Sequence, residues 1–303
     1  FPSLLLLRAI GNALPPRHHA NQTLSNLEFT LKHEERLPNV ARHWFLNRLA
    51  DANVEQRILR LLESRGESYT IIPFDKEEYR RVPYHYERKL GFTGVPEHGD
   101  PKIEHEKIVY AINVNGVRNS MLEFGKRNTS AEFILPWDGN CFLTRSGWKS
   151  IVEGIRKHSG HRYFVVPMDR LRGPNEQLLS PDYTPGRKEE PQIIFHREST
   201  ALFNPNLRYG WQNKEELLAA LGAFRGRLQW GKWERSIVRD WRQRRNPVRD
   251  FPRPKQLGAR EIGWVARLWS GKSEAEAQKH VRGQARTLGI NSLLQTLDTR
   301  VIK

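Results

Sequence analysis

Short apolar runs alternate with longer amphipathic segments in the first quarter of the chain. The runs Leu4–Ile10, Arg42–Asn47 and Ser68–Phe74 are largely apolar or aromatic, which is typical of buried strands. Between them, apolar residues at helical spacing predict helices over Leu24–Glu34 and Val54–Ser64. This alternation predicts an α/β fold in which helices cover a mostly parallel sheet.

A second group of elements follows a long polar stretch, residues 75–107, which we interpret either as a lid over a site or as a surface excursion. Ile108–Ile112 and Glu132–Pro136 are predicted strands, and Arg118–Lys126 between them has helical spacing. The second strand runs into Asp138-Gly139-Asn140. Open α/β sheets bind ligands and metals at the carboxyl ends of their strands. The motif therefore predicts a ligand site, although Asp-Gly is also a common turn sequence.

The pair Arg118-Asn119, followed by this strand and motif, resembles the nucleotide-sugar site of family 2-like GT-A glycosyltransferases. The resemblance implies a GT-A-like sheet and a nucleotide-sugar donor, with a UDP-sugar favoured. It also implies Mn²⁺ or Mg²⁺ bridging the two phosphates of the donor. The metal ligands would be Asp138, Asn140 and, from a later strand, His196. The motif departs from the family pattern because it ends in Asn, which leaves one fewer negative charge for a cation.

The same resemblance assigns further roles residue by residue. It makes Asp51 a donor-binding residue, but Asp51 could instead cap the helix that follows it, a role that Asp favours. The donor, the acceptor (a glycan, a protein or a small molecule) and the stereochemistry stay open. The candidates for the catalytic base are Glu189, Glu190 and Asp182. The residues expected to bind the donor are Arg8, Asn12, Asp51, Asn115, Arg118, Asn119, Trp137 and Asp138.

The middle of the chain continues the alternation. Thr144 is a predicted cap for a helix over Arg145–Lys157. Strands are predicted at His161–Met168 and Gln192–Arg197, and a helix over Lys214–Gly222. With the first elements they form residues 1–223, which the resemblance identifies as a GT-A-like glycosyltransferase domain.

From residue 224 the pattern changes, which predicts a basic, Trp-rich helical extension over residues 224–303. Trp230, Trp233, Ile237 and Trp241 share one helical face, and Arg235, Arg239 and Arg242 share another. Further helices are predicted over Ala259–Trp269, Ser273–Leu288 and Asn291–Thr299.

The chain is strongly basic, with a formal net charge of +16. Half of this excess, eleven Lys and Arg against three acids, lies between Arg225 and Lys255. Such a charge favours phosphate-bearing substrates, an anionic membrane surface or nucleic acid. The Trp/Arg helix also allows an alternative function, nucleic-acid binding. However, an aromatic face on a helix packs against a core more often than it stacks on bases. A nucleotidyltransferase is the nearest enzymatic alternative.

Other features bound the function. No run approaches the roughly 18–20 apolar residues of a membrane span. Cys141 is the only cysteine, which excludes an intrachain disulfide and a cysteine metal cluster. Walker, Gly-x-Ser-x-Gly and His-Glu-x-x-His motifs are absent. The chain starts at Phe1 rather than Met, so we expect a preceding segment, and cytoplasm and secretory lumen both stay open.

Overall fold

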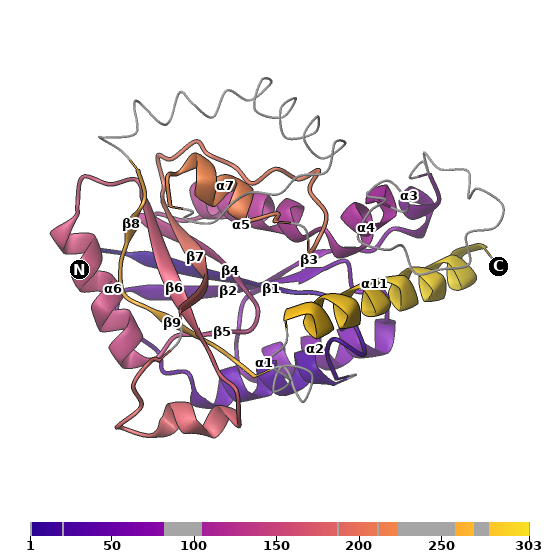
Figure 1. Ribbon diagram of the computed structural model, residues 1–303, viewed down its shortest axis with the longest axis horizontal. Helices are drawn as coiled ribbons and strands as arrows, with labels where there is room; N and C mark the ends of the chain where they lie inside the picture. The colour runs from indigo at the N-terminus through magenta and orange to yellow at the C-terminus, as the bar shows by residue number, and fades with distance from the viewer. Residues whose placement is uncertain are drawn as a thin grey trace.

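The computed structural model describes residues 2–19, 21–81, 105–186, 188–210, 212–223, 258–269 and 279–302. Within these ranges the protein is a mixed α/β structure whose curled, mostly parallel sheet is flanked by helices (Figure 1). The strands are β1 (Leu4–Ile10), β2 (Val40–Asn47), β3 (Tyr69–Ile72), β4 (Phe133–Asp138), β5 (Cys141–Phe142), β6 (Tyr163–Arg170), β7 (Lys188–His196), β8 (Arg260–Glu261) and β9 (Val265–Arg267). The helices are α1 (Gln22–His33), α2 (Ala52–Ser64), α3 (Lys76–Arg81), α4 (His105–Ile112), α5 (Val114–Asn128), α6 (Arg145–Lys157), the short 3₁₀ helix η1 (Asn175–Leu179), α7 (Glu215–Ala220) and α11 (Lys279–Ile302).

The strand order is β3-β2-β1-β4-β7-β6-β9-β5, and β8 pairs with β6. The strands β3, β2, β1 and β4 run parallel, whereas β7 is antiparallel to both β4 and β6. The carboxyl ends of the four parallel strands therefore meet at one edge of the sheet, where ligands bind in folds of this kind. The α/β prediction is confirmed.

The alternation of side chains along β1 divides the core into two layers. Leu4 and Leu6 join the cluster covered by α6, and Leu5 and Leu7 join the opposite cluster with residues of α5 and α7. Figure 1 shows α6 on one side of the sheet and α5 and α7 on the other. Because successive strand residues point to opposite faces, one uninterrupted Leu run can fill both layers.

The strand predicted at Ile108–Ile112 is wrong, because these residues form α4. Ile108, Tyr110 and Ala111 pack with Tyr79 and with the apolar side of α11. A short apolar run is compatible with a strand or with a buried helix. Which of the two forms depends on the residues far along the chain that it packs against. The α5 helix begins two residues after α4 ends. Asn113, between them, has a φ of 47°, and this left-handed conformation separates the two helices.

The helix predicted over Ala259–Trp269 is also wrong. β8 and β9 occupy this stretch, separated by Gly263 at φ 48°, and β9 pairs with β6 in the same sheet. The segments Ser273–Leu288 and Asn291–Thr299, predicted as separate helices, contain parts of one helix, α11. The Trp/Arg helix and most of the polar stretch at 75–107 lie outside the described residues.

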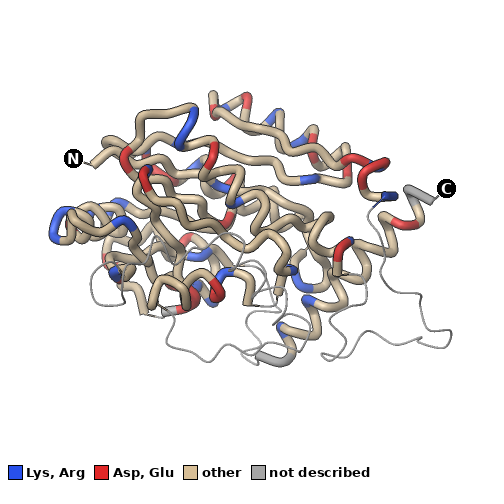
Figure 2. The backbone as a smooth tube through the Cα atoms, turned by 90° about the horizontal axis from the view of Figure 1, so that it is seen from above, with Lys and Arg blue, Asp and Glu red and all other residues tan. Residues whose placement is uncertain are grey.

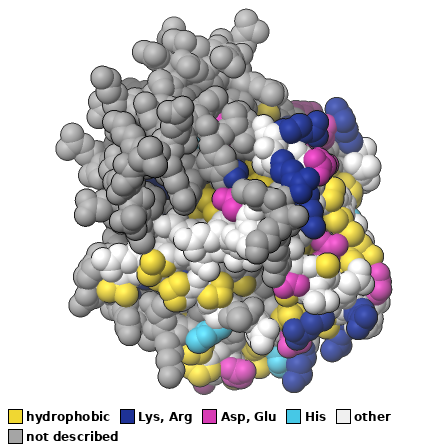
Figure 3. All heavy atoms as spheres, turned by 90° about the vertical axis from the view of Figure 1, so that its right-hand side faces the viewer, with side chains coloured by type: hydrophobic (Ala, Val, Ile, Leu, Met, Phe, Trp, Pro, Cys, Tyr) yellow, Lys and Arg dark blue, Asp and Glu magenta, His cyan; other side chains and the backbone are white. Residues whose placement is uncertain are grey.

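Charges of both signs are interspersed along the described backbone (Figure 2). On the face shown in Figure 3, Lys and Arg side chains lie beside Asp and Glu side chains, so the visible described surface is not uniformly basic. The basic stretch 225–255 lies outside the described residues. In the described part of the chain, no helix is long and apolar enough to cross a bilayer.

We expect His105, at the start of α4, to make the stability of the fold depend on pH. Its Nε2 lies 2.7 Å from the carbonyl oxygen of Asn206, and burial lowers the pKa of the imidazole to about 4. The bond to Asn206 opposes this shift, and the charge of Arg208 adds to it. The unfolded chain therefore binds a proton near pH 6.5 that the folded protein accepts only near pH 4, so stability falls as the pH drops through this window.

We expect the free energy of unfolding to fall by about 2 kcal/mol between pH 8 and pH 5 through His105 alone. Urea titrations at both pH values would measure this change in the protein and in His105→Gln. The variant should lose about that much of the pH dependence. An equal pH dependence in the two proteins would contradict the assignment.

Candidate functional site

A cavity of about 290 Å³ lies at the carboxyl ends of β1, β2 and β4. Its walls come from the loop after β1, the end of β2, the first turns of α5, the segment after β4 and α11. The side chains used below are Asn12, Asn47, Arg118, Trp137, Asp138, Asn140, Glu190, Glu215, Arg267 and Arg286. This is the edge at which the sequence predicts a ligand site.

Asp138, the last residue of β4, is surrounded by hydrogen-bond donors. Arg118 Nη2 donates to its Oδ1 over 2.7 Å, and Gln192 Nε2 donates to its Oδ2 over 2.9 Å. Lys214 Nζ lies 3.6 Å from Oδ2. Burial opposes ionisation of the carboxyl group, but Lys214 and Arg118 outweigh it and hold the pKa of Asp138 well below its usual range. Asp138 is therefore an anion at neutral pH.

Lys214 links Asp138 to a second carboxylate. Its Nζ lies 2.9 Å from Glu190 Oε1, and its side chain is only 1% exposed. Burial alone would raise the pKa of Glu190, but the Lys214 ammonium outweighs burial and lowers it. For Glu215 the balance is reversed, because burial and the charge of Glu190 raise its pKa. The cavity thus contains an ionised Glu190 beside a Glu215 that binds its proton more tightly.

The start of α5 holds this arrangement in place. Asn115 Oδ1 accepts from Arg118 Nη1 over 2.9 Å, and its amide donates to the carbonyl oxygens of Asn204 and Asn213. Asn119 exchanges two hydrogen bonds with the backbone of Phe203, 2.8 and 3.0 Å long. The sequence predicts both asparagines as donor-binding residues. In the structure they tie α5 to the segment that ends at Lys214 and are not among the residues that line the cavity.

The Asp-Gly-Asn segment follows β4 without space for a larger central residue. A Cβ on Gly139 would lie 2.2 Å from the carbonyl oxygen of Ala9, so only glycine fits against β1. Asn140 has a buried Oδ1 with no hydrogen-bond partner, while its backbone oxygen accepts from Leu268. Trp137 is buried and donates through Nε1 to the carbonyl oxygen of Ile193.

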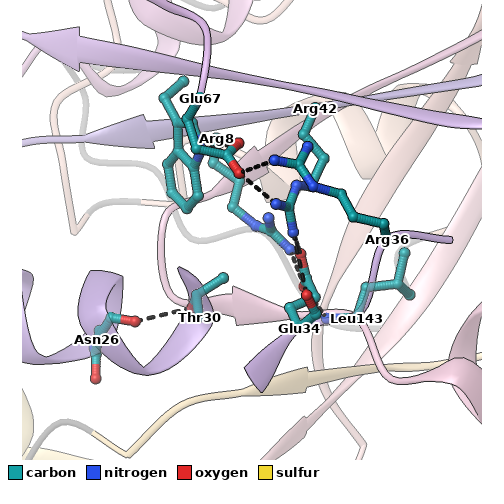
Figure 4. A network of polar contacts seen from close by, with 9 residues as sticks. Arg8, Asn26, Thr30, Glu34, Arg36, Arg42, Glu67 and Leu143 are labelled. Carbon is teal, nitrogen blue, oxygen red and sulfur yellow. Dashed lines mark hydrogen bonds and ion pairs between the residues drawn. The ribbon is translucent and has the colours of Figure 1, made fainter. Parts of the chain in front are cut away.

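Three residues predicted to bind the donor have structural partners. Arg8 is buried in an ion-pair network with Glu34, described below (Figure 4), and is not among the residues that line the cavity. Asn12 lines the cavity, but its side chain bonds the backbone of Arg48 and Ala50. Asp51 caps α2, because its Oδ1 accepts from the backbone N–H groups of Asn53 and Val54, and so has the alternative role that the sequence suggested.

The predicted third metal ligand lies far from Asp138. His196 pairs with Phe133, at the opposite end of β4 from Asp138. Five strand residues span about 16 Å, so one cation cannot contact both side chains. His196 is therefore not a ligand of a cation held by Asp138, and this prediction is corrected.

The three candidate bases are separated in the structure. Glu190 lines the cavity. Glu189, on the other side of β7, is surrounded by Arg170, Arg267 and Arg282. Asp182 is exposed in the loop after η1. Of the three, the geometry brings Glu190 to Asp138.

The side chains around Asp138 do not fit a tightly held Mn²⁺ or Mg²⁺. Within the described residues, no group of three His, Cys, Asp or Glu side chains could hold a metal ion. Both oxygens of Asp138 already accept from cationic or amide groups, and the side-chain oxygen of Asn140 is shielded from solvent. Such ions prefer several free oxygen ligands and a net negative charge.

Sequence reasoning missed Lys214, Gln192, Glu215, Arg267 and Arg286. Lys214 follows Asn213, which resembles an ordinary helix start, and Lys214 and Gln192 come from segments far from Asp138 along the chain. One signal was present: Gln192 is an uncharged polar residue entering the apolar run of a strand, where a buried amide needs a partner.

The comparisons with known proteins give a similar solved structure but no family. No family model and no curated protein matches the chain. One similar solved structure is 4-diphosphocytidyl-2C-methyl-D-erythritol synthase from Anaerococcus prevotii DSM 20548, at 10% identity and a TM-score of 0.33 over 97% of this chain and 96% of that one. At that TM-score, no property is transferred from it.

Proposed function

We propose that the protein is a transferase that moves a sugar from a nucleotide-sugar donor, a UDP-sugar by preference, to an acceptor hydroxyl. The observation that carries the proposal is the group of Arg118, Asp138 and Glu190, which line a cavity at the carboxyl ends of parallel strands and are linked by the buried Lys214. It combines a cationic group for phosphate with an ionised carboxylate for a proton, which are the two requirements of glycosyl transfer.

The start of α5 suits the donor diphosphate. Arg118 stands in the second turn of α5 and lines the cavity. Backbone N–H groups at a helix start are unpaired, and the helix dipole favours an anion there. Asn12, on the loop after β1, and Asn47, the last residue of β2, line the same cavity, where the nucleoside would bind.

Glu190 would take the acceptor proton. In the proposed step, the bond between the anomeric carbon and the diphosphate oxygen breaks, and that oxygen leaves with the electron pair. A bond forms between the anomeric carbon and the acceptor oxygen, whose proton passes to the Glu190 carboxylate. Lys214 keeps this carboxylate ionised at neutral pH.

The family resemblance also implies Mn²⁺ or Mg²⁺, but the side chains around Asp138 do not fit such an ion, and no step here depends on one. The acceptor would be a glycan, a protein or a small molecule, and the basic stretch 225–255 would contact an anionic membrane surface. The nucleic-acid alternative rests on Arg235, Arg239 and Arg242, which lie outside those residues.

The second candidate is a nucleotidyltransferase, in which an acceptor phosphate attacks the α-phosphate of a nucleoside triphosphate and pyrophosphate leaves. The same guanidinium beside a cavity favours it, since two phosphorylated substrates need positive charge. A thermal-shift panel separates the two: UDP-, GDP- and CMP-sugars on one side, CTP, UTP and ATP on the other, each in EDTA and in Mn²⁺. A binding donor raises the melting temperature by mass action.

We expect a UDP-sugar to give the largest shift. A shift with a nucleoside triphosphate alone would favour nucleotidyl transfer, and no shift with any nucleotide would contradict both functions.

Arg118→Lys should lower transfer from that donor at least about tenfold, roughly 1.4 kcal/mol of transition-state stabilisation. Lysine is a point charge and cannot reproduce the planar fork that contacts Asn115 and Asp138. Initial rates of nucleotide release measure the effect. The matched control is Arg127→Lys on the same helix, where the guanidinium is 76% exposed and, among the described residues, forms an ion pair with Glu123. If both variants keep full activity, Arg118 does not contact the donor.

A further inference from the structure

We infer that this site binds the diphosphate of its substrate without a divalent cation. The Arg118 guanidinium would neutralise the phosphates, a role that the GT-A resemblance gives to Mn²⁺ or Mg²⁺. The inference rests on the proposed function but goes beyond it, because the sequence motif alone implies the opposite. It follows from the charges and bonds around Asp138.

The charges in the cluster already cancel. Asp138 and Glu190 carry two negative charges, and Arg118 and Lys214 carry two positive ones within hydrogen-bond or ion-pair distance. Glu215 lines the same cavity, but Arg267 and Arg286 line it too, so the wider lining is not net negative either. A divalent cation entering this cluster would meet about as much repulsion as attraction, whereas a metal site needs a net negative set of ligands.

The ligand geometry agrees with the charge balance. A cation at Asp138 would share Oδ1 with the positively charged Arg118 or Oδ2 with Gln192, with Lys214 Nζ 3.6 Å from Oδ2. The only other side-chain oxygen of the motif, Asn140 Oδ1, is neutral, buried and without a hydrogen-bond partner. The amide oxygen of Asn140 is neutral, so as a ligand it would not offset the positive charge of a cation.

Arg118 retains donors for an anion. A guanidinium has five N–H groups. Two of its nitrogens donate to Asn115 and Asp138, and Arg118 is among the residues that line the cavity. Asn115 and Asp138 fix its plane, so it can meet phosphate oxygens without first being ordered. Lys214 is too buried to contact the ligand and acts as a positioning residue for the two carboxylates.

Calorimetric titration with UDP, GDP and CDP tests the inference, each in EDTA and in Mn²⁺. We expect the preferred nucleoside diphosphate to bind with the same Kd in both buffers, within about twofold. Arg118→Gln should weaken binding in EDTA by at least tenfold, and Arg127→Gln should not change it. Electron paramagnetic resonance of free Mn²⁺ should show no binding to the protein, with or without the nucleotide.

Asn140→Asp provides the complementary variant. A carboxylate at this position makes the cluster net negative, so the variant should acquire Mn²⁺ binding and a Mn²⁺-dependent Kd for the same nucleotide. Nucleotide binding by the unaltered protein that requires Mn²⁺ would overturn the inference and leave the proposed function intact. Unchanged affinity in Arg118→Gln would also overturn it. No nucleotide binding in either buffer would overturn both.

Discussion

Glu34→Gln is expected to lower the free energy of unfolding by about 3–5 kcal/mol, which is the usual cost of removing one partner from a buried ion pair. Glu34 follows α1, and its side chain is 1% exposed. It pairs with Arg8 and with Arg42, and it accepts a hydrogen bond from the backbone N–H of Leu143 (Figure 4). The substitution keeps the shape of the side chain but removes the buried charge that pairs with Arg8 and shares Arg42.

The network extends to a second buried carboxylate, which keeps a counter-charge beside Arg42 but not beside Arg8. Glu67 pairs with Arg42 and Arg36 and accepts from Trp44 Nε1. It cannot replace Glu34 beside Arg8, because its oxygens already have these partners. Strands β1 and β2, the end of α1 and the segment before α6 are therefore joined through one carboxylate.

Glu35→Gln is the matched control. Its carboxylate is 51% exposed and pairs with Arg145, which is 52% exposed, and such pairs contribute about 0–1 kcal/mol. Urea titrations at pH 7 on both variants would make the comparison. Equal, small losses in the two would mean that the buried network contributes no more than a surface pair.

This network also shows what sequence patterns can and cannot predict. The apolar run of β1, the amphipathic α6 and its Thr144 cap follow from local rules, and the structure confirms all three. Nothing local in Glu34 or Glu67 indicates that they are buried, because their partners lie on other elements. The resemblance predicts that Arg8 binds the donor, and its local sequence gives no sign of a partner on another element. In the structure it forms a buried ion pair with Glu34.

The candidate site divides in the same way. Asp138 and Arg118 are 20 residues apart on one strand–helix unit, and the motif indicated their proximity. Lys214 and Gln192 reach Asp138 only through the pairing of β7 with β4 and through the contacts of Asn115 with the loop before α7. The register of β7 also separates Glu190 from His196, two residues that the sequence could only group as neighbours on one strand.

Glu190→Gln should lower turnover by about 10²–10⁴-fold, the usual contribution of a general base, with a much smaller change in KM for the donor. Asp182→Asn is the matched control. The sequence offers Asp182 as an equal candidate, but its exposed side chain is not among those that line the cavity, and its rate should equal that of the unaltered protein. Loss of turnover in Asp182→Asn with turnover kept in Glu190→Gln would reverse the assignment.

The pH dependence of turnover then tests Lys214. A base works only when ionised, so activity falls on the acid side as the pH passes below the pKa of Glu190. Lys214 holds that pKa below its ordinary value against the effects of burial and of Asp138. In Lys214→Met only the opposing effects remain, the pKa rises, and the acid limb of the turnover profile should move to higher pH. A merely structural lysine would lower stability without moving this limb. An acid limb at the same pH in both proteins would therefore show that Glu190 is not the group that takes the proton.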